Sequence, residues 1–294
     1  MSNLRAISKI LEPTINLPLP SDFASKHPAQ PRALGEGRLT VSCSKTGKTQ
    51  VQALRHAGST KLVFPQSHKA ALEAIVVNTA GGITGGDTFS LHATAQSGTS
   101  LTLTTQAAER AYRAQTGEVG RVTTKLVVDA EACLNWLPQE LILFDHCALR
   151  RNLDIDLVNG SRFLLVEPIV FGRTAMNEEL RDIRFYDRIG ITRNQKPLYL
   201  DGMDMMGDAV SHMGRAAIGN GAKAMASLVL VADDAASYLA TVRAMLPPTA
   251  GASMIAEDVL VVRHLACDSF ILRRDLIPIL NHLTHNSLPI SWRL

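Results

Sequence analysis

The sequence is poor in aromatic residues and in charge of one sign, and each shortage excludes a class of protein. Aromatic side chains make up 5% of the 294 residues, which is little for a surface that stacks nucleic-acid bases. The 30 Lys and Arg residues stand against 27 Asp and Glu residues, so the chain lacks the basic excess of a nucleic-acid-binding domain. We therefore expect no nucleic acid among its partners.

Cysteine is also scarce, and long apolar runs are missing. The four cysteines are widely separated, without a C-x-x-C pair or a zinc-ligand spacing, as is typical of reduced cytosolic thiols. The first residues lack the apolar core of a signal peptide, and no apolar run approaches the ~20 residues that span a bilayer. The sequence thus predicts a cytoplasmic protein with no membrane partner.

What the sequence does contain is enough apolar residues for a large core, arranged mostly in short alternating segments. Hydrophobic residues make up 46% and charged residues 19%, which argues against disorder. Polar and apolar side chains alternate at 99–105, 121–128 and 153–157, the period of a strand with one buried face. Many short strands followed by few helices favour one mostly-β domain, and an open β-sandwich would suit this pattern.

The two ends of the chain differ from this middle part. Near the C-terminus, the pair Asp233-Asp234 is placed to cap a helix that runs to Leu246, and a second helix is expected from Asp268 to about Leu283. The first residues are rich in proline and have few periodic apolar positions. We interpret 1–37 as a mobile or loosely docked arm and 38–294 as a single domain.

A glycine cluster stands out at 78–87, which reads Asn-Thr-Ala-Gly-Gly-Ile-Thr-Gly-Gly-Asp. Such density indicates backbone with positive φ or very close approach to a neighbour. The cluster follows the apolar run 72–77, so we expect a strand to enter a sharp corner that ends in Asp87. The spacing departs from the dinucleotide fingerprint G-x-G-x-x-G. A structural corner is the main interpretation, and a surface for a partner or ion is the alternative. The four glycines are Gly81, Gly82, Gly85 and Gly86.

Five further carboxylates stand in unusual settings, those of Glu109, Glu140, Asp145, Glu167 and Glu178. A carboxylate in an apolar interior costs several kcal/mol unless it is paired or hydrated. Ion pairs with nearby arginines, such as Arg110 and Arg150, are one explanation. The other is a hydrated internal passage lined with oxygen ligands, which would concentrate a divalent cation electrostatically.

Signals for catalysis are weak. The segment Gly47-Lys48-Thr49 looks like the end of a phosphate loop, but Ser42 stands where that loop needs a glycine, so an exposed hairpin turn is the better interpretation. No nucleophile elbow or H-E-x-x-H helix is present. Glu140 with Asp145 as the acid/base pair of a hydrolase is a minor alternative, because no cleft signature accompanies them.

Three long blocks, at 78–87, 104–113 and 136–145, occur in an order found in one known family. The second reads Thr-Thr-Gln-Ala-Ala-Glu-Arg-Ala-Tyr-Arg, and the third Trp-Leu-Pro-Gln-Glu-Leu-Ile-Leu-Phe-Asp. With Leu-Leu-Val-Glu-Pro-Ile-Val-Phe-Gly-Arg-Thr-Ala-Met at 164–176, they resemble the UreD family of urease accessory proteins, called UreH in some organisms. The resemblance implies a mostly-β fold, a β-helix-like stack of short sheets with a small two-helix element near the C-terminus.

The resemblance also implies a function without catalysis. UreD-type proteins bind the urease apoprotein and the accessory protein UreF, which recruits the GTPase UreG and through which a dimeric assembly forms. Nickel is pictured as passing through an internal tunnel, with no tightly bound cofactor. Such a path needs weak ligands, because a Cys/His cage would trap nickel. The candidates are Asp87, Glu140, Asp145 and Glu167. The alternative is a scaffold that does not conduct nickel.

Overall fold

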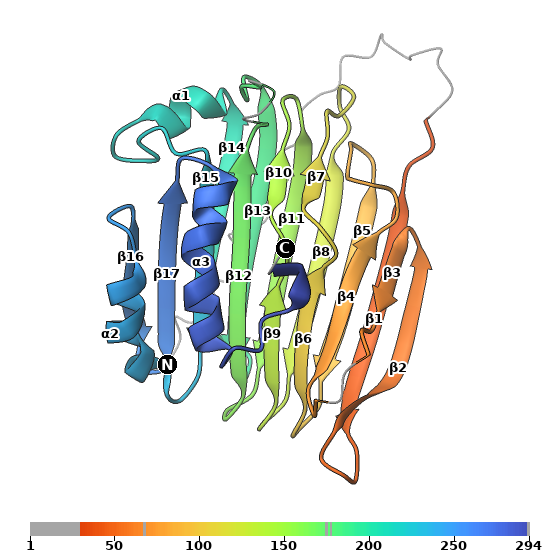
Figure 1. Cartoon of the computed structure of the whole chain (residues 1–294). Coiled ribbons are helices and arrows are strands. Elements are labelled where there is room, and N and C mark those ends of the chain that lie inside the picture. Colours follow the sequence, from red (N-terminus) through yellow and green to blue (C-terminus); the bar gives the residue numbers. More distant parts are fainter. Residues whose placement is uncertain (1–29, 67–68, 174–175, 177, 293–294) are drawn as a thin grey trace, which may run out of the picture. The chain divides into compact units, whose positions relative to one another are not determined.

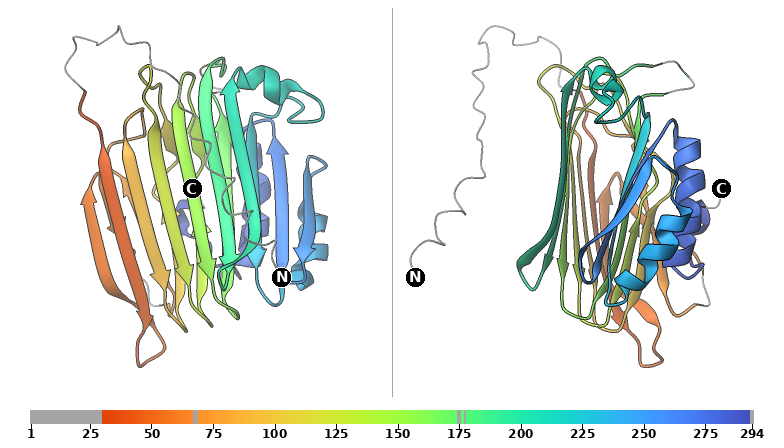
Figure 2. Two further views of the ribbon diagram at one scale, coloured as in Figure 1. Left: turned by 180° about the vertical axis from the view of Figure 1, so that it is seen from behind. Right: turned by 90° about the vertical axis from the view of Figure 1, so that its left-hand side faces the viewer.

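The computed structural model describes residues 30–66, 69–173, 176 and 178–292. From Arg32 onward the strands of the chain form two β-sheets that lie face to face (Figures 1 and 2). The first sheet contains, in spatial order, β14 (Lys196–Gly207), β13 (Ile183–Arg193), β11 (Ala148–Leu157), β8 (Gly120–Val128), β5 (Thr88–Ala95), β1 (Leu34–Cys43) and β2 (Thr49–Gly58). The second contains β16 (Ala250–Ala256), β17 (Val259–Ala266), β15 (Ala224–Val231), β12 (Arg162–Phe171), β9 (Cys133–Leu137), β6 (Ser100–Thr105), β4 (Leu72–Asn78) and β3 (Thr60–Val63). Two short strands, β7 (Glu109–Ala111) and β10 (Leu141–Leu143), join the second sheet through β12.

The central part of the fold is a solenoid of stacked coils. From β4 to β13 the chain alternates between the sheets, and the strands that become neighbours within each sheet pair in parallel. Antiparallel strands occur at the ends of the stack, where β2, β14, β3 and β15 to β17 are added. The β-helix-like stack is confirmed. The parallel pairing distinguishes this stack from the open β-sandwich that the alternating polar and apolar pattern also allowed.

Period-two alternation decides which side chains enter the space between the sheets. In β8, Leu126 and Val128 are buried between the sheets while Lys125 is exposed. Part of the outer face of the second sheet, at β12, β15 and β17, is buried as well, because helices cover it (Figure 1). As a result, β12 and β15 are buried on both faces.

The predicted helical element is present near the C-terminus. Helix α2 (Ala235–Met245) follows Asp234, whose side chain pairs with Arg162 instead of capping the helix. In α3 (Ser269–Leu283), Asp268 accepts a hydrogen bond from the backbone N–H of Ile271 at 2.7 Å, as expected of an N-cap. A short helix, α1 (Ala209–Gly214), and a 3-10 turn, η2 (Ile290–Trp292), complete the fold. No helix of the described part is long and apolar enough to cross a membrane.

The first strand begins earlier than the sequence indicated. The predicted arm, 1–37, falls mostly on residues outside the described part, but its end is wrong, because β1 begins at Leu34 and pairs with both β2 and β5. The inward positions at the start of β1 are Gly35 and Gly37. A Cβ added at Gly35 would lie 2.3 Å from Oγ1 of Thr60, so glycine stands where the pattern of a strand needs an apolar residue.

Candidate functional site

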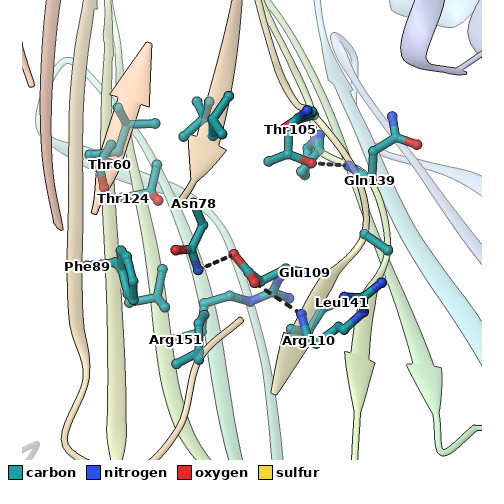
Figure 3. A pocket seen from close by; sticks show the side chains of 18 of the residues that line it. Thr60, Asn78, Phe89, Thr105, Glu109, Arg110, Thr124, Gln139, Leu141 and Arg151 are labelled. Atoms are coloured by element: carbon teal, nitrogen blue, oxygen red, sulfur yellow. Dashed lines mark hydrogen bonds between the residues drawn. The ribbon is translucent and has the colours of Figure 1, made fainter. Parts of the chain in front are cut away.

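A cavity of about 350 Å³ lies between the two sheets (Figure 3). Its walls come from both sheets and from the segments before β7 and β10, with apolar side chains that include Phe89, Trp136 and Leu149. Ionisable groups project into this space, namely Glu109, Arg110, Arg151 and Glu167. A cavity of mixed apolar and charged lining is one that water can hydrate.

Glu109 lies on one side of this cavity and is held by nitrogen donors. The side-chain amide of Asn78 donates to Oε2 of Glu109 at 3.1 Å, and the backbone N–H of Arg110 donates to Oε1 at 3.1 Å (Figure 3). Burial raises the pKa of Glu109, although these two hydrogen bonds oppose the shift. The Asn78 amide also donates to the carbonyl of Gly82 at 3.0 Å, so the glycine corner is tied to the cavity wall.

Deeper in, Arg151 bridges two buried carboxylates. Its Nε and Nη2 donate to the two carboxylate oxygens of Asp187 at 2.8 and 2.6 Å, and its Nη1 lies 2.5 Å from Oε2 of Glu167. Because Glu167 belongs to the second sheet and the other two to the first, this contact joins the sheets. The indole N–H of Trp136 donates to the other oxygen of Glu167 at 2.6 Å.

The pKa values of Glu167 and Arg151 are both raised, but for different reasons. Burial raises the pKa of Glu167, and the charge of Asp187 adds to the rise, against the attraction of Arg151. Burial alone would lower the pKa of Arg151, but Asp187 and Glu167 outweigh burial and raise it. The guanidinium therefore stays charged, while burial brings Glu167 closer to taking up a proton.

A second, small cavity lies beyond Glu167. Glu167 and Asp187 line it together with Asp201, Ser227 and Arg263. Arg263 donates to Asp201 at 2.7 Å and to the hydroxyl of Ser227 at 2.7 Å, and 44% of its side chain is exposed. The carboxylates of Glu109, Glu167, Asp187 and Asp201 thus form a series from the large cavity to the surface at Arg263.

Among the four candidate ligands named from the sequence, Glu167 alone lines the large cavity. Asp87 is buried, but Oδ1 accepts from the backbone N–H of Ala33 at 2.7 Å and Oδ2 from that of Thr84 at 2.8 Å. Both oxygens are therefore engaged in closing the glycine corner against the start of β1. This geometry supports a structural role for Asp87.

The glycine cluster is the sharp corner that was expected. Gly81, Gly82 and Gly86 have φ of 79°, 156° and 85°. A Cβ at Gly82 would lie 2.2 Å from the ring of Tyr112, so this position excludes a side chain by space as well. Gly85 has ordinary φ, but a Cβ there would lie 2.8 Å from the Cβ of Ala114.

Glu140 and Asp145 make local contacts away from the cavity. Oε1 of Glu140 lies 3.1 Å from Nη1 of Arg273, which fixes α3 to the edge of β10. Oδ1 of Asp145 accepts from the backbone N–H groups of Arg181 and Asp182 at 2.8 and 3.0 Å. Burial alone would raise the pKa of Asp145, but these hydrogen bonds outweigh it and lower the pKa.

These contacts also weaken the hydrolase alternative. Asp145 lines a surface groove with Arg173 and Glu178, while Glu140 lies in none of the three cavities described for residues 30–292. The two carboxylates therefore do not line the same one of these cavities. The segment at Gly47 is the turn between β1 and β2, as expected, with the N–H of Gly47 donating to the carbonyl of Ser44 at 3.0 Å.

Sequence reasoning missed Arg151 and Asp187, although a signal was present. Arg151 shares its strand face with Leu149 and Leu153, and Asp187 shares its face with Phe185 and Ile189. In each strand, period two places one charged residue between two inward apolar ones. The same rule would have identified both as interior charges.

Clusters of candidate metal ligands are missing from the described residues. No group of three or more His, Cys, Asp or Glu side chains with metal-binding geometry occurs among them. Cys147 is buried, and burial raises the pKa of its thiol to about 12, so it stays protonated at neutral pH. The ionisable side chains that line the two cavities are carboxylates and guanidinium groups.

Comparison with known proteins places the chain among relatives. The profile of the family described as UreD urease accessory protein matches residues 34–292. A urease accessory protein UreD of Ruegeria pomeroyi is 50% identical over 257 residues, covering 87% of this chain and 98% of that protein. One of Roseobacter denitrificans is 47% identical over 265 residues (90% and 96%), and one of Rhizobium etli is 38% identical over 264 (90% and 96%). The chain therefore belongs to the UreD family of urease accessory proteins.

Proposed function

We propose that this urease accessory protein is a non-catalytic scaffold that carries nickel to the urease apoprotein through the space between its sheets. It binds the apoprotein and UreF, and UreF recruits the GTPase UreG and joins two copies into a dimeric assembly, all in the cytoplasm. The observation that carries the proposal is the series Glu109, Glu167, Asp187 and Asp201, which leads from the large cavity to the surface. Nickel is the cargo here and not a resident cofactor.

The chemistry of the lining suits transport better than storage. Carboxylate oxygens attract a divalent cation, but they hold nickel less firmly than imidazole or thiolate. In the described part, these carboxylates alternate with guanidinium groups and stand apart from histidine and cysteine. A cation that enters meets one weak ligand after another and is able to leave.

The proposal is tested by filling the cavity without touching its charges. Thr124 of β8 is buried and lines the cavity, whereas its neighbour Thr123 is exposed on the outer face of the same strand. Thr124→Trp is expected to co-purify with UreF and the urease apoprotein yet fail to activate urease in nickel-limited cells. Thr123→Trp is the matched control and should activate normally.

The same pair of variants decides between conduction and the alternative, a scaffold that shapes urease while nickel travels elsewhere. Normal activation by Thr124→Trp, with its larger side chain inside the cavity, would favour the scaffold. Loss of UreF or urease from the Thr124→Trp complex would show that the variant disturbs the scaffold itself. In that case Val122→Phe, at another cavity-lining position of β8, takes its place.

A further inference from the structure

Arg151 puts a permanent positive charge beside Glu167, where the two cavities of the proposed passage approach each other. The large cavity lies on one side of Glu167 and the small one on the other, and Glu167 lines both. The guanidinium lies between the carboxylates of Glu167 and Asp187, within 2.8 Å of each. A divalent cation that moves from one cavity to the other meets a charge of its own sign at this point.

We propose that Arg151 is an internal latch: its guanidinium occupies the carboxylate oxygen of Glu167 to which a divalent cation such as Ni²⁺ binds, and the cation passes by displacing the guanidinium from Glu167. This inference rests on the proposed function, since it names the regulation of the same passage. The ligand class is a divalent cation bound by carboxylate oxygens.

The charges of Glu167 and Asp187 explain why this site needs a positive group, either the guanidinium or a cation. Two carboxylates without a cation in a buried site repel each other, and one of them would take up a proton. With Arg151 in place the three groups carry a net charge of −1. Without the guanidinium, the two carboxylates would attract a divalent cation more strongly. Arg151 therefore lowers the affinity of the site for that cation.

The geometry shows which contact gives way. Asp187 holds the guanidinium at two points, with aligned hydrogen bonds at 2.8 and 2.6 Å. Oε2 of Glu167 is within 2.5 Å of Nη1, but it is buried and receives no aligned hydrogen bond from the described residues. A two-point contact to a carboxylate is the stronger one, so Arg151 leaves Glu167 first and stays on Asp187. The adjoining cavity of about 350 Å³ gives the side chain room to move.

Trp136 provides a direct reporter for the arrival of a cation. Its indole N–H donates to Glu167 at 2.6 Å, and the chain contains only one other tryptophan, Trp292. Ni²⁺ quenches indole fluorescence at short range. A titration of the purified full-length protein with Ni²⁺ alone therefore reads out occupation of Glu167, and loss of the signal in Trp136→Phe assigns it.

The decisive variant is Arg151→Met, which removes the charge and keeps an unbranched side chain. We expect its quenching midpoint at a Ni²⁺ concentration at least about tenfold lower than in the wild type, a change of about 1.4 kcal/mol. Arg151→Met with Glu167→Gln should lose this gain. The matched control is Arg188→Met, whose guanidinium lies 2.7 Å from Asp154 in an exposed pair on the outer face; it should leave the midpoint unchanged.

An unchanged midpoint in a folded Arg151→Met protein, judged by circular dichroism, would overturn the latch. If that variant does not fold, Arg151→Lys replaces it, because a single ammonium lacks the two-point grip on Asp187. Its midpoint should move in the same direction by a smaller factor, and no movement would again overturn the latch.

The titration uses no urease, so it separates this inference from the proposed function. A lower midpoint in Arg151→Met, combined with normal urease activation by Thr124→Trp, would support the latch and remove conduction. Loss of activation in Thr124→Trp, combined with an unchanged midpoint in Arg151→Met, would support conduction and remove the latch.

Discussion

Arg151 and Asp187 are register partners on the neighbouring parallel strands β11 and β13, and the guanidinium donates to both oxygens of the carboxylate. Parallel strands in register place equivalent positions side by side on one face. Two charged residues that interrupt two apolar faces therefore meet inside the solenoid. A lone charge at either position would carry a heavy desolvation cost, so the pair is what permits charge in this interior.

Glu109 should make stability depend on pH. Its pKa is raised above the ordinary 4.5 by burial, so between 4.5 and the raised value the native state binds more protons than the unfolded state. The free energy of unfolding should then fall as the pH rises through that window. Urea unfolding of the wild type and of Glu109→Gln checks this, because the glutamine variant should show a flatter pH dependence.

The same measurement has a clear contrary result. If the wild type and Glu109→Gln lose stability in parallel between pH 4.5 and 7, Glu109 does not carry the effect. Glu131, which is exposed in the turn after β8, offers a matched Glu→Gln control that should behave as the wild type.

The four free cysteines should differ in reactivity toward a thiol reagent in the folded protein. Cys43 and Cys267 are exposed and should react first. Burial raises the pKa of Cys133, and it raises that of Cys147 to about 12, so neither forms much thiolate at neutral pH. Two fast thiols are expected under native conditions and four in denaturant. Fast labelling of Cys147 without denaturant would contradict the buried position of that residue.

Gly82 should be the least replaceable glycine of the corner. A Cβ there meets the ring of Tyr112 at 2.2 Å, whereas a Cβ at Gly81 has no atom within 4 Å although its φ is 79°. Gly81→Ala should therefore cost only the left-handed backbone penalty of about 1–2 kcal/mol. Gly82→Ala should cost more, as measured by the denaturant midpoint. Equal losses would mean that Tyr112 moves aside freely.

Asp87→Ala should act on stability before it acts on urease. The change leaves the N–H groups of Ala33 and Thr84 without their acceptors, and each unsatisfied buried group costs about 1–3 kcal/mol. Asp87→Asn keeps one acceptor oxygen and should lose less. Thermal melts of both variants test this. Unchanged melting of Asp87→Ala together with loss of urease activation would instead return Asp87 to the nickel path.

The sequence by itself determined the strand-rich character, the two C-terminal helices and the glycine corner. These follow from local chemistry: alternating polarity in 121–128, a capping residue at Asp268, and glycine where φ is positive. It also carried the family resemblance that the comparisons confirmed. Of the site, local pattern singled out Glu109 and Glu167 but could not separate them from Asp145. A carboxylate beside an apolar run looks the same whether it accepts from backbone amides, as Asp145 does, or lines a cavity.

Only the tertiary structure decided the rest. Which sheet a strand joins, and whether its neighbours are parallel, depends on contacts between residues far apart in the chain, such as Trp136 with Glu167 and Arg151 with Asp187. The start of β1 was missed for a related reason. Thr60, from a distant part of the chain, leaves no space for a side chain at Gly35, so a glycine stands there in place of the apolar residue that marks a strand. The winding of the solenoid and the register between its strands bring Arg151, Asp187 and Glu167 together from three strands. The spacing of residues along any one strand does not contain that information.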